Sequence, residues 1–194
     1  MSDEERTPPT RIRVTGLQEA QIQDLERFGF DAANEAVLVG IERPPRRGSE
    51  IARLARTHDV VVAEADHEPA GYLAWRDEEP GVAVLDTVIV GTEYRRFGIG
   101  TRLARELGEH ARKAGIEDCV AWVHPKATWA AAFLTVLGFA PLASVPSPPS
   151  AKLERWRELH AADIAAGPDQ LFWRHTAKLG VTELPGVPLP PDDD

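Results

Sequence analysis

The chain has 194 residues, of which 43% are hydrophobic and 27% charged, and this composition is typical of a soluble protein with one core. Its formal net charge of −9 argues against nucleic acid as a partner, because phosphate binding needs a basic face. Its single cysteine, Cys119, excludes an intrachain disulfide and a cysteine-based zinc site. No apolar run approaches the roughly 18 residues that cross a membrane, so we expect a cytoplasmic protein with no membrane partner.

The two ends of the chain have the composition of disordered segments. Residues 1–10 are acidic and contain a proline pair, and residues 183–194 are proline-rich and end in three aspartates. Residues 11–182 are expected to form one domain, in which a helical insert occupies about residues 144–167.

The first half of that domain favours short strands separated by helices. Apolar and β-branched runs predict strands at residues 11–14, 60–62, 71–75 and 82–90. Between the first two strands, apolar residues at helical spacing predict a helix that is interrupted at Phe28-Gly29-Phe30. A second helical piece is predicted to begin at Asp31.

After residue 90 the apolar period becomes helical. The spacing predicts helices over residues 99–114, 127–137 and 152–165, and strands over residues 119–123, 139–143 and 171–179. Hairpins early in the chain and helical crossovers late predict a single α/β domain with a mixed sheet.

The strand at residues 82–90 leads into a loop with the features of an anion site. Arg95, Arg96, Gly98 and Gly100 lie between that strand and the next helix. The first N–H groups of a helix lack partners and carry partial positive charge, so a loop of this kind can bind phosphate. The alternative is that the glycines serve only a tight turn. The segment is neither a Walker A loop nor a complete dinucleotide fingerprint.

Two segments together resemble the GNAT family of N-acetyltransferases. Arg95-x-x-Gly98-x-Gly100, after Val88-Ile89-Val90, is similar to the acetyl-CoA signature of that family. Residues 130–139, which end in Gly138-Phe139, resemble the family's helix that ends in Gly-Phe. The resemblance covers about residues 11–142. It implies a single GNAT-like domain, with a mixed, mostly antiparallel central sheet whose strands splay apart, flanked by helices.

The resemblance also implies where acetyl-CoA would bind. Its pyrophosphate would lie on residues 95–101, and its pantetheine arm would pair with the strand at residues 88–90, where strands 85–90 and 119–124 splay. A backbone N–H near Val90 would stabilise the oxyanion. The cofactor-binding residues implied in this way are Val88, Ile89, Val90, Arg95, Arg96, Phe97, Gly98, Ile99, Gly100, Thr101, Ala130 and Leu134. No metal is expected.

For the general base, the resemblance points to the splayed strands. Asp86 is the first candidate, because a carboxylate is unusual in so apolar a strand, and period two predicts that it shares a face with Val88 and Val90. The alternative is that Asp86 pairs with an arginine in the sheet. His124, at the end of the other splayed strand, is the second candidate; its alternative is a structural role before Pro125.

The chain also departs from the family pattern. Leu134 stands where members commonly carry a tyrosine that protonates the leaving thiolate, and Ala127 stands where many have asparagine. Ala127, Ala130 and Leu134 are predicted to share one helical face, with Leu134 facing the cofactor sulfur. Tyr94 and Thr135 are weaker candidates for the acid. These departures keep open a non-catalytic acyl-CoA-binding sensor or regulatory module, and more distantly a nucleotide-phosphate binder.

The expected function is transfer of an acetyl group from acetyl-CoA to a primary amine of an unidentified acceptor, by direct attack on the thioester. Glu35, Glu42 and Asp86 would favour a cationic amine. Three tryptophans are expected near the cleft, namely Trp75, Trp122 and Trp129. The insert at residues 144–167 would shape the acceptor pocket or a homodimer interface.

Overall fold

The computed structural model describes residues 7–42, 44–144, 150–166 and 169–175. The expectations of disorder for residues 1–6 and 183–194 lie outside the described residues. Thr10, at the edge of the described part, donates hydrogen bonds from its backbone N–H and hydroxyl to Asp66.

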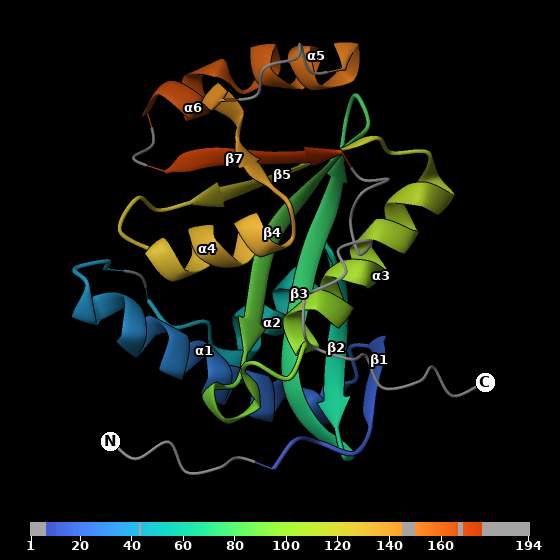
Figure 1. The fold of residues 1–194 in the computed structure, drawn as a ribbon, viewed down its shortest axis with the longest axis vertical. Coiled ribbons are helices and arrows are strands. Elements are labelled where there is room, and N and C mark those ends of the chain that lie inside the picture. Colours follow the sequence, from blue (N-terminus) through green and yellow to red (C-terminus); the bar gives the residue numbers. More distant parts are fainter. Residues whose placement is uncertain (1–6, 43, 145–149, 167–168, 176–194) are drawn as a thin grey trace.

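Seven strands form one sheet in the order β1-β2-β3-β4-β5-β7-β6 (Figure 1). Neighbouring strands are antiparallel except β4 and β5, which run parallel. The strands are β1 (Ile12–Gly16), β2 (Asp59–Ala65), β3 (Glu68–Glu78), β4 (Val82–Val90), β5 (Asp118–Val123), β6 (Ala140–Pro141) and β7 (Gln170–His175). The predicted mixed, mostly antiparallel sheet is therefore confirmed.

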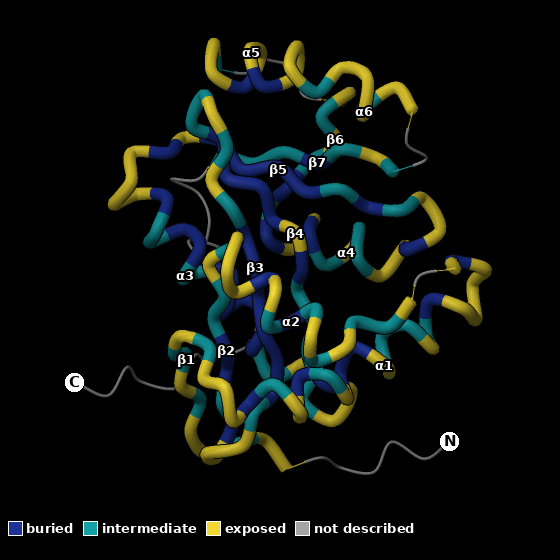
Figure 2. The backbone as a smooth tube through the Cα atoms, turned by 180° about the vertical axis from the view of Figure 1, so that it is seen from behind, coloured by how far each residue is buried: buried dark blue, intermediate teal, exposed yellow. Residues whose placement is uncertain are grey.

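Helices cover both faces of this sheet. They are α1 (Ile22–Leu38), α2 (Gly48–Leu54), α3 (Ile99–Ala114), α4 (Thr128–Val136), α5 (Ala151–Leu159) and α6 (Ala161–Ala166), with short 3-10 turns at Glu19–Gln21, Thr92–Tyr94 and Leu142–Ser144. The core beneath α3 and α4 is the largest, while α1 with α2, and α5, pack on two smaller clusters. Buried residues follow the central strands, and exposed residues follow the loops and outer helix faces (Figure 2). No helix in these described ranges is long and apolar enough to cross a membrane.

Helix α1 is continuous, so the predicted interruption at Phe28-Gly29-Phe30 is wrong. Phe28 is buried in the cluster between α1 and the sheet. Gly29 is required by a close approach, because a Cβ there would lie 2.8 Å from the carbonyl oxygen of Arg46. Glycine inside this helix therefore makes room for the loop before α2 rather than ending the helix.

The insert forms two helices, α5 and α6, where one had been predicted. Trp156 of α5 is buried against Val82 and Val84 of β4 and Val120 of β5. Cys119, beside Val120, is fully buried and lies opposite Ala83 in the parallel pair. Helix α5 thus covers the part of the sheet where β4 and β5 are paired.

Strands β4 and β5 pair only along their first halves. Their ladder runs from Val82 opposite Asp118 to Leu85 opposite Ala121, and beyond it the two strands diverge (Figure 1). On its other side, β4 stays paired with β3 as far as Val90. We call the opening between the second halves of β4 and β5 the seam. It confirms the predicted splay of these strands.

Candidate active site

After Leu85, the backbone of β4 pairs with a neighbouring strand on one side only. Residues 87–90 pair with β3, but within the described part of the chain they have no ladder partner across the seam. Backbone N–H and C=O groups on such an edge can pair with an extended ligand as a further strand would. Val88, Ile89 and Val90 border this unpaired side, and their contact with a pantetheine arm stays a prediction.

The loop after β4 is shaped as an anion cradle, by which we mean residues 96–100. Arg96 has φ +72° and Gly98 has φ +77°, and such a left-handed turn before a helix start makes successive N–H groups converge. A Cβ on Gly98 would meet nothing within 4 Å, so the space above it is open. Arg96 is exposed and has no ion-pair partner among the residues described. A cation and free N–H groups thus border the same open space.

Arg95 is directed elsewhere. Its guanidinium donates two hydrogen bonds to the carboxylate of Glu35, at 2.7 and 2.9 Å, and its Nε donates to the carbonyl oxygen of Val90 at 3.1 Å. Arg95 therefore ties the cradle to α1 and to the end of β4. Of the two arginines predicted to supply charge, Arg96 is the one left free to do so.

The side chains on either side of Gly98 are buried or partly buried. Ile99 and Thr101 are buried, Phe97 is half-buried, and a Cβ on Gly100 would lie 2.8 Å from the ring of Phe133. Only the backbone of this stretch is available to an anion. Phe133 of α4, which the sequence did not single out, is the reason that residue 100 has no side chain.

Ala127, directly before α4, and Ala130 and Leu134 of α4 all contribute to one core. Ala127 and Leu134 are buried in the core under α3 and α4, and Ala130 packs against it. Whether Leu134 faces the sulfur of a bound cofactor stays a prediction.

Asp86 does not share a face with Val88 and Val90, so that prediction is wrong. Leu85 pairs with Trp75 and Thr87 pairs with Ala74, which leaves Asp86 as the extra residue of a β-bulge. The bulge shifts the alternation by one residue, so Val88 and Val90 pack under α3 and α4 while Asp86 lies on the opposite face.

On that face, cationic and neutral donors surround the carboxylate of Asp86. Its Oδ2 accepts hydrogen bonds from Arg46 Nη2 and Thr87 Oγ1, each at 2.7 Å. Its Oδ1 lies 3.6 Å from Arg76 Nη1 and 4.0 Å from His58 Nε2. Burial opposes ionisation, but the Thr87 hydroxyl and the Arg46 charge outweigh it, so the pKa of Asp86 lies below its usual value. The predicted alternative, an arginine pair in the sheet, is thus present.

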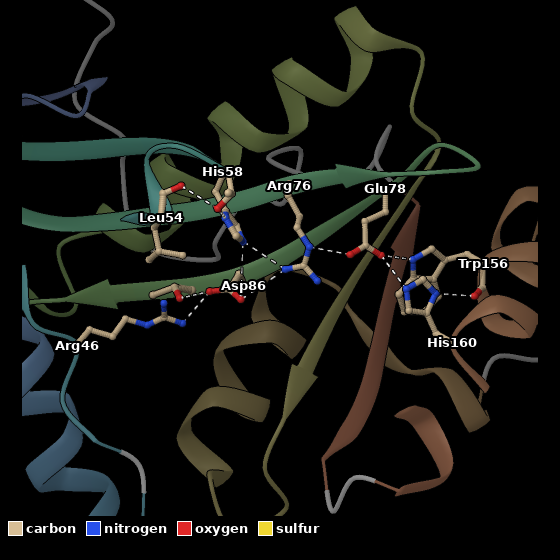
Figure 3. A network of polar contacts seen from close by, with 10 residues as sticks. Arg46, Leu54, His58, Arg76, Glu78, Asp86, Trp156 and His160 are labelled. Atoms are coloured by element: carbon tan, nitrogen blue, oxygen red, sulfur yellow. Dashed lines mark hydrogen bonds and ion pairs between the residues drawn. The ribbon is translucent and has the colours of Figure 1, made fainter. Parts of the chain in front are cut away.

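The polar contacts continue along the sheet toward α5 (Figure 3). Arg76 Nε donates to Glu78 Oε1 at 2.7 Å, and Glu78 Oε2 accepts from Trp156 Nε1 at 2.6 Å and lies 3.2 Å from His160 Nε2. Arg46, His58, Arg76 and Glu78 were not predicted from the sequence. Tyr72, Arg76 and Glu78 alternate on one face of β3, but the strand was predicted only at residues 71–75, so this signal was not used.

His58 is the titratable group beside Asp86. Its side chain is 10% exposed, and its Nδ1 lies 2.8 Å from the hydroxyl of Thr57. Burial lowers the pKa of His58, Asp86 opposes that effect, and the charges of Arg76 and Arg46 add to it. His58 is therefore a neutral imidazole at pH 7.

The other predicted site residues are held apart from Asp86. His124 Nδ1 accepts a hydrogen bond from the backbone N–H of Lys126 at 3.2 Å, and no hydrogen bond or ion pair joins it to Asp86 in the described ranges. Glu42 is exposed. Of the tryptophans, Trp75 is buried in the core and Trp122 packs beside Trp156, whereas Trp129 is 44% exposed.

Comparison with known proteins identifies the family. The model of the acetyltransferase (GNAT) family matches residues 21–139, which is more than half of the chain. The chain belongs to the GNAT acetyltransferase family. A search of curated proteins gave no significant match to this acetyltransferase.

Solved structures of other acetyltransferases share the fold. The PaiA N-acetyltransferase of Thermoplasma acidophilum, in complex with coenzyme A, superimposes with a TM-score of 0.60 at 15% identity, over 86% of this chain and 99% of that one. YncA of Salmonella typhimurium, a putative acetyltransferase with acetyl-CoA, gives 0.55 at 15% identity, over 91% and 98%. The ribosomal-protein-S18-alanine N-acetyltransferase of Escherichia coli gives 0.57 at 14% identity, over 86% and 94%. At these identities the likeness establishes the GNAT fold and leaves the acceptor open.

Proposed function

We propose that this acetyltransferase moves the acetyl group of acetyl-CoA to a primary amine, by direct attack of the amine nitrogen on the thioester. The observation that carries the proposal is that an open backbone edge on β4 leads directly into an anion cradle, in a chain of the GNAT family. The coenzyme A and acetyl-CoA bound by PaiA and YncA support the choice of donor.

The residues of the cradle and the seam would bind different parts of acetyl-CoA. The backbone N–H groups of residues 96–100 and the exposed guanidinium of Arg96 would take the pyrophosphate. The edge of residues 88–90 that no strand pairs with, where the Val90 carbonyl oxygen already accepts from Arg95 Nε, would pair with the amides of the pantetheine arm. Ala130 and Leu134 would supply an apolar wall from α4.

Asp86 and His58 would act on the acceptor amine, Asp86 by binding its ammonium and His58 by accepting a proton. The lowered pKa of Asp86 makes it a weak base at neutral pH, so we assign it to binding the acceptor ammonium. His58 is neutral and lies 4.0 Å from that carboxylate, and it would accept the proton at Nε2 once Arg76 Nη1, which lies 3.3 Å from that nitrogen, has moved away. The nitrogen then attacks the thioester carbon and the N–C bond forms. As the C–S bond breaks, the nitrogen loses its second proton to water, and the CoA thiolate leaves and takes a proton from water because Leu134 has none to give.

Free-thiol release from acetyl-CoA with a panel of amines tests the proposal. We expect Asp86→Asn to lower kcat/KM by about 10- to 10²-fold, the usual loss when one contact to a charged group is removed, with little change in CoA affinity. Asp163→Asn, which removes an exposed carboxylate from α6, is the matched control and should be neutral.

The pH profile separates the roles of the two groups. Because the pKa of His58 is lowered, the acidic limb of kcat/KM should lie below pH 6.5, the usual value for histidine, and His58→Gln should abolish that limb. An Asp86→Asn variant with full activity between pH 6 and 9 would exclude Asp86 from the site. CoA binding without thiol release for any amine would instead support the non-catalytic module.

A further inference from the structure

Given the proposed function, the charges beside Asp86 restrict the class of acceptor. Asp86 and Arg46 form an ion pair at 2.7 Å, and their side chains keep 26% and 32% of their surface exposed, so a ligand can reach both. Arg46 has no second carboxylate partner in the described part of the chain. Arg76, by contrast, also pairs with Glu78 at 2.7 Å. A ligand that takes Asp86 therefore leaves Arg46 alone without a counter-charge.

This arrangement disfavours a simple cationic amine. An ammonium that binds Asp86 through Oδ2 would displace Arg46 and leave a partly buried guanidinium unpaired, which is costly. Two of the three acidic groups predicted to attract a cation are also already neutralised, since Glu35 pairs with Arg95 and Asp86 with Arg46, and the third, Glu42, is exposed. The expectation of acceptor selection by negative charge thus has little support from the structure.

We propose that the acceptor is a zwitterion, a small amine that carries a carboxylate close to its nitrogen, as an α-amino acid does. Its ammonium binds the carboxylate of Asp86. Its carboxylate binds the guanidinium of Arg46, which Asp86 holds in the free protein. Two ion pairs then replace one, and each charge keeps a partner.

A second polar group on the same face supports a ligand carboxylate here. Tyr72 is fully buried, and its hydroxyl has no hydrogen-bond partner among the residues that the structure describes. Strand alternation places it on the face of β3 that carries Arg76. Burial raises its pKa to about 12, with Arg46 and Asp86 among the charges that act on it, so the hydroxyl stays a donor at neutral pH. A buried donor without a partner is one that a ligand acceptor can complete.

Matched acceptors test this class directly. Thiol release from acetyl-CoA is measured with the twenty L-amino acids, their α-amides and the corresponding decarboxylated amines. We expect at least one amino acid to exceed its amide and its amine by tenfold or more in kcat/KM. Arg46→Gln should remove that preference by raising KM for the acid more than KM for its amide, and Arg46→Lys should keep part of it. Arg56→Gln, which removes an exposed charge beyond α2, is the matched control.

Tyr72→Phe provides a variant that does not depend on Arg46. It should raise KM for the amino acid several-fold without lowering the midpoint of urea unfolding, because the hydroxyl makes no hydrogen bond in the free protein. If the wild-type enzyme acetylates the amides or the decarboxylated amines as well as the amino acids, the inference of a zwitterionic acceptor is wrong, while the proposal of acetyl transfer is unaffected. If no amine releases thiol, the proposal of acetyl transfer is wrong. Calorimetry of amino acids with the CoA complex then tests the zwitterionic ligand by itself, and absence of binding would overturn that inference.

Discussion

Gly98 and Gly100 stand two positions apart in one loop, and they lack side chains for different physical reasons. Gly98 has φ +77° and borders open space, so it serves both the turn and the approach of a ligand. Gly100 lies under the ring of Phe133, and a Cβ there would be 2.8 Å from it. The sequence identified both as a phosphate loop, but the role of Gly100 depends on the packing of a distant helix, which local spacing does not encode.

Substitutions at the two glycines should therefore separate binding from stability. We expect Gly98→Glu to abolish CoA binding, because a carboxylate would occupy the open space of the anion cradle, while the left-handed turn adds about 1 to 2 kcal/mol of strain. Gly100→Ala should instead lower the free energy of unfolding by about 1 to 3 kcal/mol, since Phe133 must move. Calorimetry with CoA and urea unfolding measure the two effects. Unchanged CoA affinity in a folded Gly98→Glu variant would exclude this loop as the pyrophosphate site.

Among the elements, β4 and α1 show what the sequence does and does not contain. The apolar run predicted β4 at residues 82–90, and helical spacing predicted α3 at residues 99–114, and both match the structure. The bulge at Asp86 was not predictable, because it is a property of the register between β3 and β4. The continuity of α1 through Gly29 was not predicted for a similar reason, because a glycine is needed there by the close approach of the Arg46 backbone from another segment.

The start of α5 offers a test at the scale of elements. Ser150 accepts a hydrogen bond from the backbone N–H of Leu153 and donates one to Asp118, a fully buried carboxylate that also accepts from Trp173 Nε1. We expect Ser150→Ala to lower the free energy of unfolding by about 1 to 3 kcal/mol, because the helix loses its cap and Asp118 loses a donor. Urea unfolding beside Ser49→Ala, an exposed serine on α2, provides the comparison. Equal midpoints for the two variants would contradict this role of Ser150.

For the whole molecule, the sheet separates two chemically different faces. The cradle follows β4 and begins α3, and its nature was predictable because its residues are contiguous. The opposite face collects Arg46, His58, Arg76 and Asp86 from four segments, and only the folded sheet brings them together. The proposed donor side of the candidate site could thus be predicted from contiguous residues of the sequence, whereas the proposed acceptor side could be found only from the fold.

The groups on that second face make stability depend on pH in a defined direction. Although burial opposes ionisation of Glu78, hydrogen bonds from Trp156 and Arg76 leave its pKa below the usual value, and the pKa values of Asp86 and His58 are lowered as well. The unfolded chain therefore binds more protons than the folded protein at acidic pH. Stability should be full above about pH 6.5, should fall first through His58, and should fall again below about pH 4.5 through Glu78 and Asp86.

Thermal unfolding between pH 8 and pH 4 measures this dependence. His58→Gln should flatten the fall in melting temperature between about pH 6.5 and pH 5, because the substituted residue does not titrate. A wild-type melting temperature that stays constant or rises from pH 7 to pH 5 would show that His58 is not held neutral in the fold.

The burial of Cys119 has a consequence for the order of events during turnover. Its thiol is fully buried in β5, and burial raises its pKa, so no cysteine thiolate of this chain can carry the acetyl group between the two substrates. Direct attack of the amine on the thioester, as proposed, requires that donor and acceptor occupy the enzyme together. We expect initial-velocity plots against the two substrates to intersect rather than run parallel, and protein incubated with radiolabelled acetyl-CoA alone to carry no label on Cys119.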